Sequence, residues 1–147
     1  MAYRREPVAP PTPLRRCNIH DRVEEARSRY RRMRPAEAYC ATGLGSLLID
    51  TRDGGQLRRD GLVPGAVVID RTVLEWRIDP ESGATHPAIT SLHLPLILLC
   101  HEGYSSSLAV ASLLDLGATD VTDVEGGFAA WRAAGLPVAP FGPLGRS

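Results

Sequence analysis

Four short apolar runs constrain the fold of this chain most strongly, because each of them predicts a buried strand. The runs lie at residues 47–49, 66–69, 96–99 and 121–124. Helical stretches are predicted between and after them, at residues 56–60, 106–116 and 127–134. Strands that alternate with helices need crossover connections, which place helices on both faces of a mostly parallel sheet. We therefore expect an α/β fold, and a chain of 147 residues has room for one such domain.

Cys100 ends the third apolar run and opens a short loop that leads into the predicted helix from Ser106. Ligands of parallel sheets bind beyond the carboxyl ends of the strands, where Cys100 falls. Backbone N–H groups of the loop and of the helix N-terminus converge there and favour a thiolate, and Gly103 allows a tight loop conformation. Because no second cysteine lies nearby in the sequence, we expect Cys100 to accept a group covalently and pass it on.

The loop Cys100-His101-Glu102-Gly103-Tyr104-Ser105-Ser106 resembles the active-site loop of rhodanese-like sulfurtransferases, especially the single-domain kind. Further matches flank the loop in the order of that family. They are Leu48-Ile49-Asp50-Thr51-Arg52, Val63-Pro64-Gly65-Ala66, Glu125-Gly126-Gly127-Phe128-Ala129-Ala130-Trp131 and Gly135-Leu136-Pro137. The resemblance implies a rhodanese-like three-layer domain, in which a mostly parallel central sheet lies between helices.

The same resemblance implies an enzyme that moves a sulfane sulfur from a donor such as thiosulfate to a thiophilic acceptor. Cys100 carries over as the nucleophile that forms a persulfide, and the loop from His101 to Ser106 carries over as its cradle. Asp50 and Arg52 match the family's motif after the first core strand, where we expect an ion pair that supports the loop. No cofactor is implied.

The loop departs from thiosulfate-preferring members of the family, which often carry cationic side chains there. This loop offers His101 and the acidic Glu102 instead. Arg71 and Arg77 are therefore our candidates for binding an anionic donor, and Arg71 is favoured because it follows a predicted strand. In the alternative interpretation, both arginines pair with neighbouring carboxylates and serve only the fold.

Two other functions compete with sulfur transfer. Phosphatase relatives of this fold use a longer loop with an arginine near its end, and residues 100–107 contain no arginine, so phosphatase chemistry is disfavoured. A catalytically weak rhodanese-like binding or regulatory module is the main alternative, because the loop has little cationic character. An intact Cys100 favours the enzyme.

The charges of the chain divide sharply between its two parts. Residues 1–34 carry ten arginines and four acidic residues, a net charge of +6, and the rest of the chain carries −6. We expect the two parts to contact each other, within one chain or across a homodimer.

Four segments are predicted along the chain. Residues 1–17 form a disordered arm rich in proline and arginine, residues 18–34 an amphipathic basic helix, residues 35–140 the rhodanese-like domain and residues 141–147 a tail. In the predicted helix, Asp21 is the expected N-cap, and the apolar stripe reaches Tyr30 and Met33.

The three cysteines, Cys17, Cys40 and Cys100, are odd in number, and no secretory signal is recognisable, so we predict a cytoplasmic protein without a disulfide framework. Cys17 and His20 have the spacing of half a zinc site, and Cys40 could be a third ligand, but no fourth ligand lies at metal-site spacing, so we predict no metal. The simplest prediction for Cys40 is a place in the core. No apolar run approaches the ~20 residues of a membrane span. The predicted partners are a small sulfur donor and acceptor or a partner protein's thiol, and not nucleic acid or a membrane.

Overall fold

Residues 6–9 and 16–142 are described by the structure, a computed structural model, and they contain a sheet of four parallel strands. The strands are β1 (Leu47–Asp50), β2 (Val67–Val68), β3 (Leu96–Leu99) and β4 (Val121–Asp123), in the spatial order β2-β1-β3-β4. β1 pairs with β3 along its whole length, from Leu47 beside Leu96 to Asp50 beside Leu99. All four predicted strands are present, although β2 is shorter than its apolar run, and the α/β fold class is confirmed.

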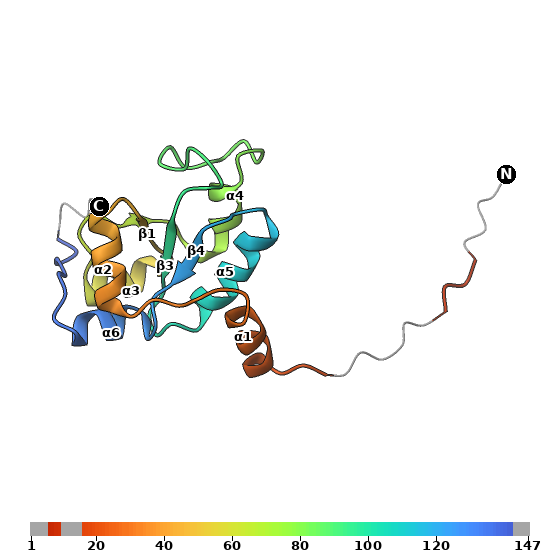
Figure 1. Ribbon diagram of the computed structural model, residues 1–147, viewed down its shortest axis with the longest axis horizontal. Coiled ribbons are helices and arrows are strands. Elements are labelled where there is room, and N and C mark those ends of the chain that lie inside the picture. Colours follow the sequence, from red (N-terminus) through yellow and green to blue (C-terminus); the bar gives the residue numbers. More distant parts are fainter. Residues whose placement is uncertain (1–5, 10–15, 143–147) are drawn as a thin grey trace.

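Helices cover both faces of this sheet (Figure 1). They are α1 (Ile19–Arg27), α2 (Pro35–Gly43), α3 (Gly54–Asp60), the 3₁₀ turn η1 (Arg71–Val73), α4 (Leu74–Ile78), α5 (Ser105–Asp115) and α6 (Gly127–Ala133). Successive residues of β3 point to opposite faces, as the strand period requires. Leu96 and Leu98 pack in the core cluster with α4 and α5, whereas Ile97 and Leu99 pack in the cluster with α2 and α6.

The N-terminal helix is shorter than predicted, because it ends at Arg27 instead of continuing to residue 34. Its N-cap is Asn18 and not Asp21. The Asp21 N–H donates to Asn18 Oδ1 at 2.9 Å, and the Asn18 N–H donates to Asp21 Oδ2 at 3.1 Å, which closes a capping box. Asp21 thus contributes to the start of the helix from its third position.

The predicted helix does not extend to Met33, because the backbone of Met33 bonds to the edge of the sheet instead. The Met33 N–H donates to Asp123 O at 3.1 Å, and Met33 O accepts from the Glu125 N–H at 2.8 Å. Met33 and Val124 thereby form a parallel bridge that extends the sheet beyond β4. These bonds satisfy backbone groups that a longer helix would otherwise pair. In Figure 1 the segment between α1 and α2 crosses the domain beside the end of β4.

Two further predictions concern the ends of the chain and a cysteine. Most of the predicted arm and most of the predicted tail, residues 1–5, 10–15 and 143–147, lie outside the described residues. Cys40 is exposed on α2, so its assignment to the core was wrong. No helix of the described segments has both the length and the apolar character that a bilayer crossing needs.

Candidate active site

Cys100 lies where β3 ends, with its sulfur enclosed by the loop that follows. Only 5% of the residue is exposed. The backbone N–H groups of Gly103 and Ser106 donate to Cys100 Sγ at 3.1 and 3.4 Å, and the thiol donates to Ser106 Oγ at 3.2 Å. Ser106 lies in the first turn of α5, where backbone N–H groups are free to bind a negative atom. Cys100 thus lies at the carboxyl end of its strand with two backbone donors facing the sulfur, and a stabilised thiolate at this position stays a prediction.

Two glycines allow the loop to fold this tightly. Gly103 has φ +85°, and a Cβ there would meet the Gly126 nitrogen at 2.8 Å. Gly127 has φ +60°, and a Cβ there would meet Cys100 O at 2.5 Å. The beginning of α6 therefore packs directly on the loop, where the Phe128 N–H donates to Cys100 O at 2.8 Å.

Asp50 and Arg52 form the predicted ion pair, and both side chains are fully buried. Arg52 Nη2 lies 2.7 Å from Asp50 Oδ2 and donates to Gly61 O at 2.9 Å. The Arg52 guanidinium also stacks on the Phe128 ring, 3.8 Å from its centroid. The pair thus connects the end of β1 with the end of α3 and with α6, whose start supports the loop.

A cavity of about 300 Å³ opens in front of Cys100. It is lined by Thr51, Arg52, Gln56, Cys100, His101, Glu102, Tyr104 and Ser105. The structure therefore gathers most of the predicted loop residues, together with Arg52, around one hollow next to the sulfur.

Arg71 and Arg77 do not reach this cavity, contrary to their prediction as contacts of the donor. Arg71 Nη1 pairs with Glu75 Oε1 at 2.8 Å and lines a different hollow, between α1 and α5. Arg77 Nη1 donates to Ala84 O at 2.8 Å. Although Arg71 follows β2 at the expected edge of the sheet, its side chain turns along the i,i+4 direction of its own helical segment.

His101, at the rim of the cavity, faces Asp60 rather than the sulfur. His101 Nδ1 lies 3.8 Å from Asp60 Oδ2. The hydrogen bond from Arg59 and the charges of Arg59, His101 and Arg132 hold the pKa of Asp60 below its usual value. The carboxylate of Asp60 therefore offsets the positive charges around that side of the loop.

Asp123 is a buried carboxylate behind the loop that the sequence analysis did not identify. Its oxygens accept hydrogen bonds from Tyr30, Arg32, Ser106 and Ser107, at distances between 2.7 and 3.1 Å. Ser106 joins this carboxylate to Cys100 Sγ through its hydroxyl. The one available signal was a charged residue inside a buried apolar run, a position that needs polar partners.

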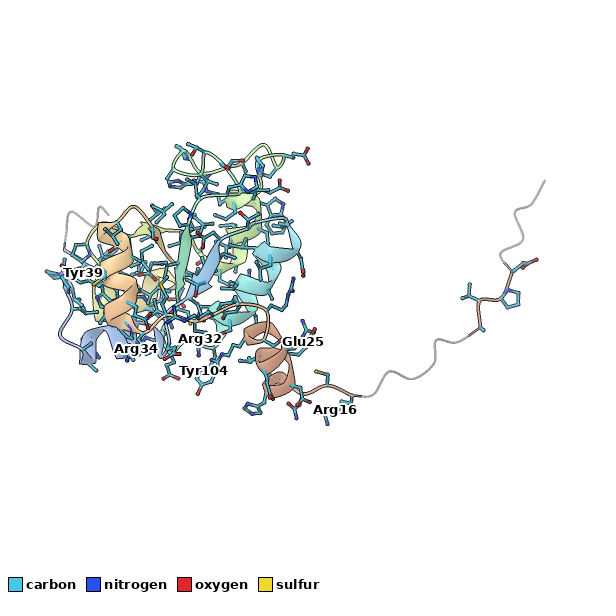
Figure 2. The ribbon with its side chains drawn as sticks, in the orientation of Figure 1. Arg16, Glu25, Arg32, Arg34, Tyr39 and Tyr104 are labelled. Carbon is cyan, nitrogen blue, oxygen red and sulfur yellow. The ribbon has the colours of Figure 1, made fainter. Side chains whose placement is uncertain are left out.

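Burial and the Asp123 charge shift the pKa values of two hydrogen-bond partners of this carboxylate, Tyr30 and Arg32. Burial and the nearby Asp123 charge raise the pKa of the Tyr30 phenol, so this hydroxyl stays protonated. Burial alone would lower the pKa of Arg32, but its hydrogen bonds and ion pair with Asp123 raise it. Figure 2 shows Arg32, on the segment between α1 and α2, and Tyr104 of the loop on the same side of the domain.

Residues 34–134 match the family model of the Rhodanese-like domain. The chain belongs to this family. Among curated relatives of the rhodanese-like domain, a thiosulfate sulfurtransferase GlpE of Pseudomonas savastanoi pv. phaseolicola is 34% identical over 104 residues, which cover 71% of this chain and 89% of the relative.

Solved structures agree with the rhodanese-like fold. A Rhodopseudomonas palustris protein of unknown function, described as a possible tyrosine phosphatase, has a TM-score of 0.77 and 32% identity, covering 88% of this chain and 99% of its own. The polysulfide-sulfur transferase homodimer of Wolinella succinogenes has a TM-score of 0.64 and 24% identity, covering 80% and 84%. The rhodanese-like match begins at residue 34, so Tyr30 and Arg32 belong to the segment that precedes it.

Proposed function

We propose that this protein is a sulfurtransferase that carries a sulfane sulfur on Cys100 as a persulfide. The observation that carries the proposal is the environment of Cys100 Sγ, which accepts hydrogen bonds from two backbone N–H groups and faces a cavity. The family and the thiosulfate sulfurtransferases among the relatives support the same chemistry.

The first half-reaction is proposed to begin when the Cys100 thiolate attacks the outer sulfur of thiosulfate. A bond forms between the two sulfurs, and the bond from the outer sulfur to the sulfite sulfur breaks. Sulfite leaves with that electron pair, and Cys100 keeps a persulfide with one negative charge. Hydrogen bonds from the loop and from the start of α5 stabilise this anion.

The second half-reaction returns Cys100 to its thiolate. A nucleophilic acceptor, such as a thiol, cyanide or sulfite, attacks the outer sulfur of the persulfide and takes it away as the sulfur–sulfur bond breaks. The cavity in front of Cys100 is open enough for a small acceptor, and a thiol on a partner protein is a second candidate.

Phosphatase activity is the alternative that one similar structure suggests, because that protein is described as a possible tyrosine phosphatase. A phosphate dianion needs a guanidinium at the end of the loop. The loop ends instead at Ser106 and Ser107, whose hydroxyls donate to Asp123, so a carboxylate lies behind the loop end. This arrangement disfavours the phosphate binding that a phosphatase requires.

The proposal is tested by measuring sulfur transfer from thiosulfate to cyanide in three cysteine variants. Cys100→Ser should abolish thiocyanate formation, whereas Cys17→Ser and Cys40→Ser, both at exposed positions, should retain the wild-type rate. Hydrolysis of an aryl phosphate, measured in parallel, should be absent from all four proteins. Equal loss in the three variants would contradict the assignment to Cys100. A wild-type protein that transfers no sulfur would favour the binding module.

A further inference from the structure

We propose that Arg27 and Arg32 are positioning residues of the Cys100 loop, which supply from behind it the positive charge that the loop lacks. The link to sulfur transfer rests on the proposed function, whereas the electrostatic effect on Cys100 can be measured without it. Both arginines precede residue 34, where the match to the rhodanese-like family begins.

Both guanidiniums bind one carbonyl of the loop. Arg27 Nη2 donates to Gly103 O at 2.8 Å, and Arg32 Nη2 donates to the same oxygen at 2.9 Å. Arg27 Nε also donates to Ser107 Oγ at 3.0 Å, and its guanidinium lies 5.5 Å from the centroid of the Tyr104 ring. These contacts fix the orientation of the peptide between Gly103 and Tyr104.

The fixed peptide turns a hydrogen-bond donor away from the arginines. In a trans peptide the carbonyl and the following N–H point in opposite directions, so the Tyr104 N–H points away from both guanidiniums. Tyr104 lines the cavity in front of Cys100, and neither arginine does. Hydrogen bonds to the carbonyl also polarise the peptide and strengthen its N–H as a donor. The two arginines thus act on the cavity through the backbone.

The charges behind the loop do not cancel. Arg32 pairs with Asp123 at 2.9 Å and neutralises a carboxylate that is connected to Cys100 Sγ through Ser106. Arg27 has no carboxylate within ion-pair distance in the described part of the chain. One positive charge, that of Arg27, therefore remains behind the loop, in a half-buried position where salt screens it less than at the surface.

The test compares how fast Cys100 reacts with iodoacetate, which is an anion, and with the neutral iodoacetamide. At one pH the fraction of thiolate is the same for both reagents. The ratio of the rate with iodoacetate to the rate with iodoacetamide therefore reports the electrostatic potential at the sulfur, and a more positive potential raises this ratio. The measurement uses the full chain with Cys17→Ser and Cys40→Ser, so that Cys100 alone reacts. Arg27→Gln should lower the ratio about threefold to tenfold, the effect expected from one nearby charge.

Arg29→Gln is the matched control. Arg29 lies two residues after Arg27, just beyond the end of α1, and the variant removes the same charge, but Arg29 pairs with Asp115 on the surface, where both side chains are exposed. The ratio should stay at the wild-type value in this variant. If Arg27→Gln and Arg29→Gln give the same ratio, the proposal is wrong.

Arg32 is tested together with its carboxylate. Arg32→Gln should lower the ratio, because it leaves Asp123 without its cation, and the double variant Arg32→Gln/Asp123→Asn should restore it. A ratio that stays low in the double variant would contradict the role of charge for Arg32. If Arg32→Gln or the double variant fails to fold, the comparison of Arg27→Gln with Arg29→Gln still tests the proposal.

The kcat/KM for thiosulfate should fall in Arg27→Gln and not in Arg29→Gln. A protein without sulfur transfer would still give the alkylation ratios, so the two proposals fail separately.

Discussion

At the scale of single residues, the chemistry depends on how buried polar groups are paired. The Cys100 thiol donates a hydrogen bond to Ser106 Oγ, and the Ser106 hydroxyl donates one to Asp123. The thiol therefore belongs to a chain of hydrogen bonds that ends on a carboxylate. When Cys100 loses its proton, the backbone N–H groups of Gly103 and Ser106 remain as donors to the sulfur. The backbone N–H groups can therefore donate to Cys100 Sγ whether or not the sulfur carries a proton. The buried Asp123 carboxylate depends on Arg32 to balance its charge and on Tyr30 for a further hydrogen bond.

The buried ion pair of Asp50 and Arg52 should contribute to the free energy of unfolding. Arg52→Met should lower the free energy of unfolding by about 3–5 kcal/mol, because it leaves the buried Asp50 carboxylate without its partner. Asp50→Asn/Arg52→Met should lose less, because no buried charge remains. Urea unfolding measures both, with Arg29→Met at an exposed ion pair as the control that should change little. A double variant as unstable as Arg52→Met would show that packing, and not charge, causes the loss.

At the scale of elements, the fold brings three separate segments to one loop. β3 delivers Cys100, α6 packs its N-terminus on the loop, and the segment after α1 binds the loop from behind. A side-chain hydrogen bond also joins α4 to α5, on the side of the sheet that these two helices cover. Glu75 on α4 accepts from Arg71 and from Ser112 of α5, at 2.8 and 2.6 Å.

Glu75 makes the fold sensitive to acid. Burial would raise the pKa of Glu75, but hydrogen bonds from Ser112 and Arg71 hold it below its ordinary value of 4.5. The unfolded chain then binds more protons near that pH, so stability is present above pH 4.5 and is lost as the pH falls through the lower value. Glu75→Gln should cost about 1–2 kcal/mol at neutral pH and show a weaker decline in acid. Urea unfolding as a function of pH tests this, and an unchanged acid profile would refute it.

The matched control for Glu75 is Glu81→Gln, which makes the same change of charge at an exposed turn. Its unfolding profile should follow that of the wild-type protein. A loss equal to that of Glu75→Gln would mean that net charge, and not the contact between α4 and α5, controls the acid response.

The sequence predicted the elements better than it predicted their side-chain partners. The four apolar runs became strands because buried β-structure needs little more than a short apolar segment between turns. The helix expected to reach Met33 stopped at Arg27, because the edge of β4 offered that backbone other partners, which no local pattern reveals. Arg71 was preferred to Arg77 because of its place after a predicted strand, but the direction of a long side chain depends on which carboxylate lies near it, and Arg71 pairs with Glu75.

At the scale of the whole molecule, the charge asymmetry of the sequence is expressed within one chain. Arg29 of the basic segment pairs with Asp115, and Arg32 pairs with Asp123, so the segment before residue 34 is bound to the acidic remainder of the domain. The expected contact between the two parts is confirmed, and an additional contact across a homodimer stays a prediction. The basic segment is therefore a structural part of the site, because it holds the loop that carries Cys100.

The intact mass of the 147-residue chain after incubation with thiosulfate tests sulfur transfer through Cys100 most directly. We predict that each wild-type chain gains the mass of one sulfur atom, loses it again on addition of cyanide, and gains none as the Cys100→Ser variant. A wild-type protein whose Cys100 reacts with iodoacetamide but gains no sulfur, or a Cys100→Ser variant that still gains one, would contradict the account.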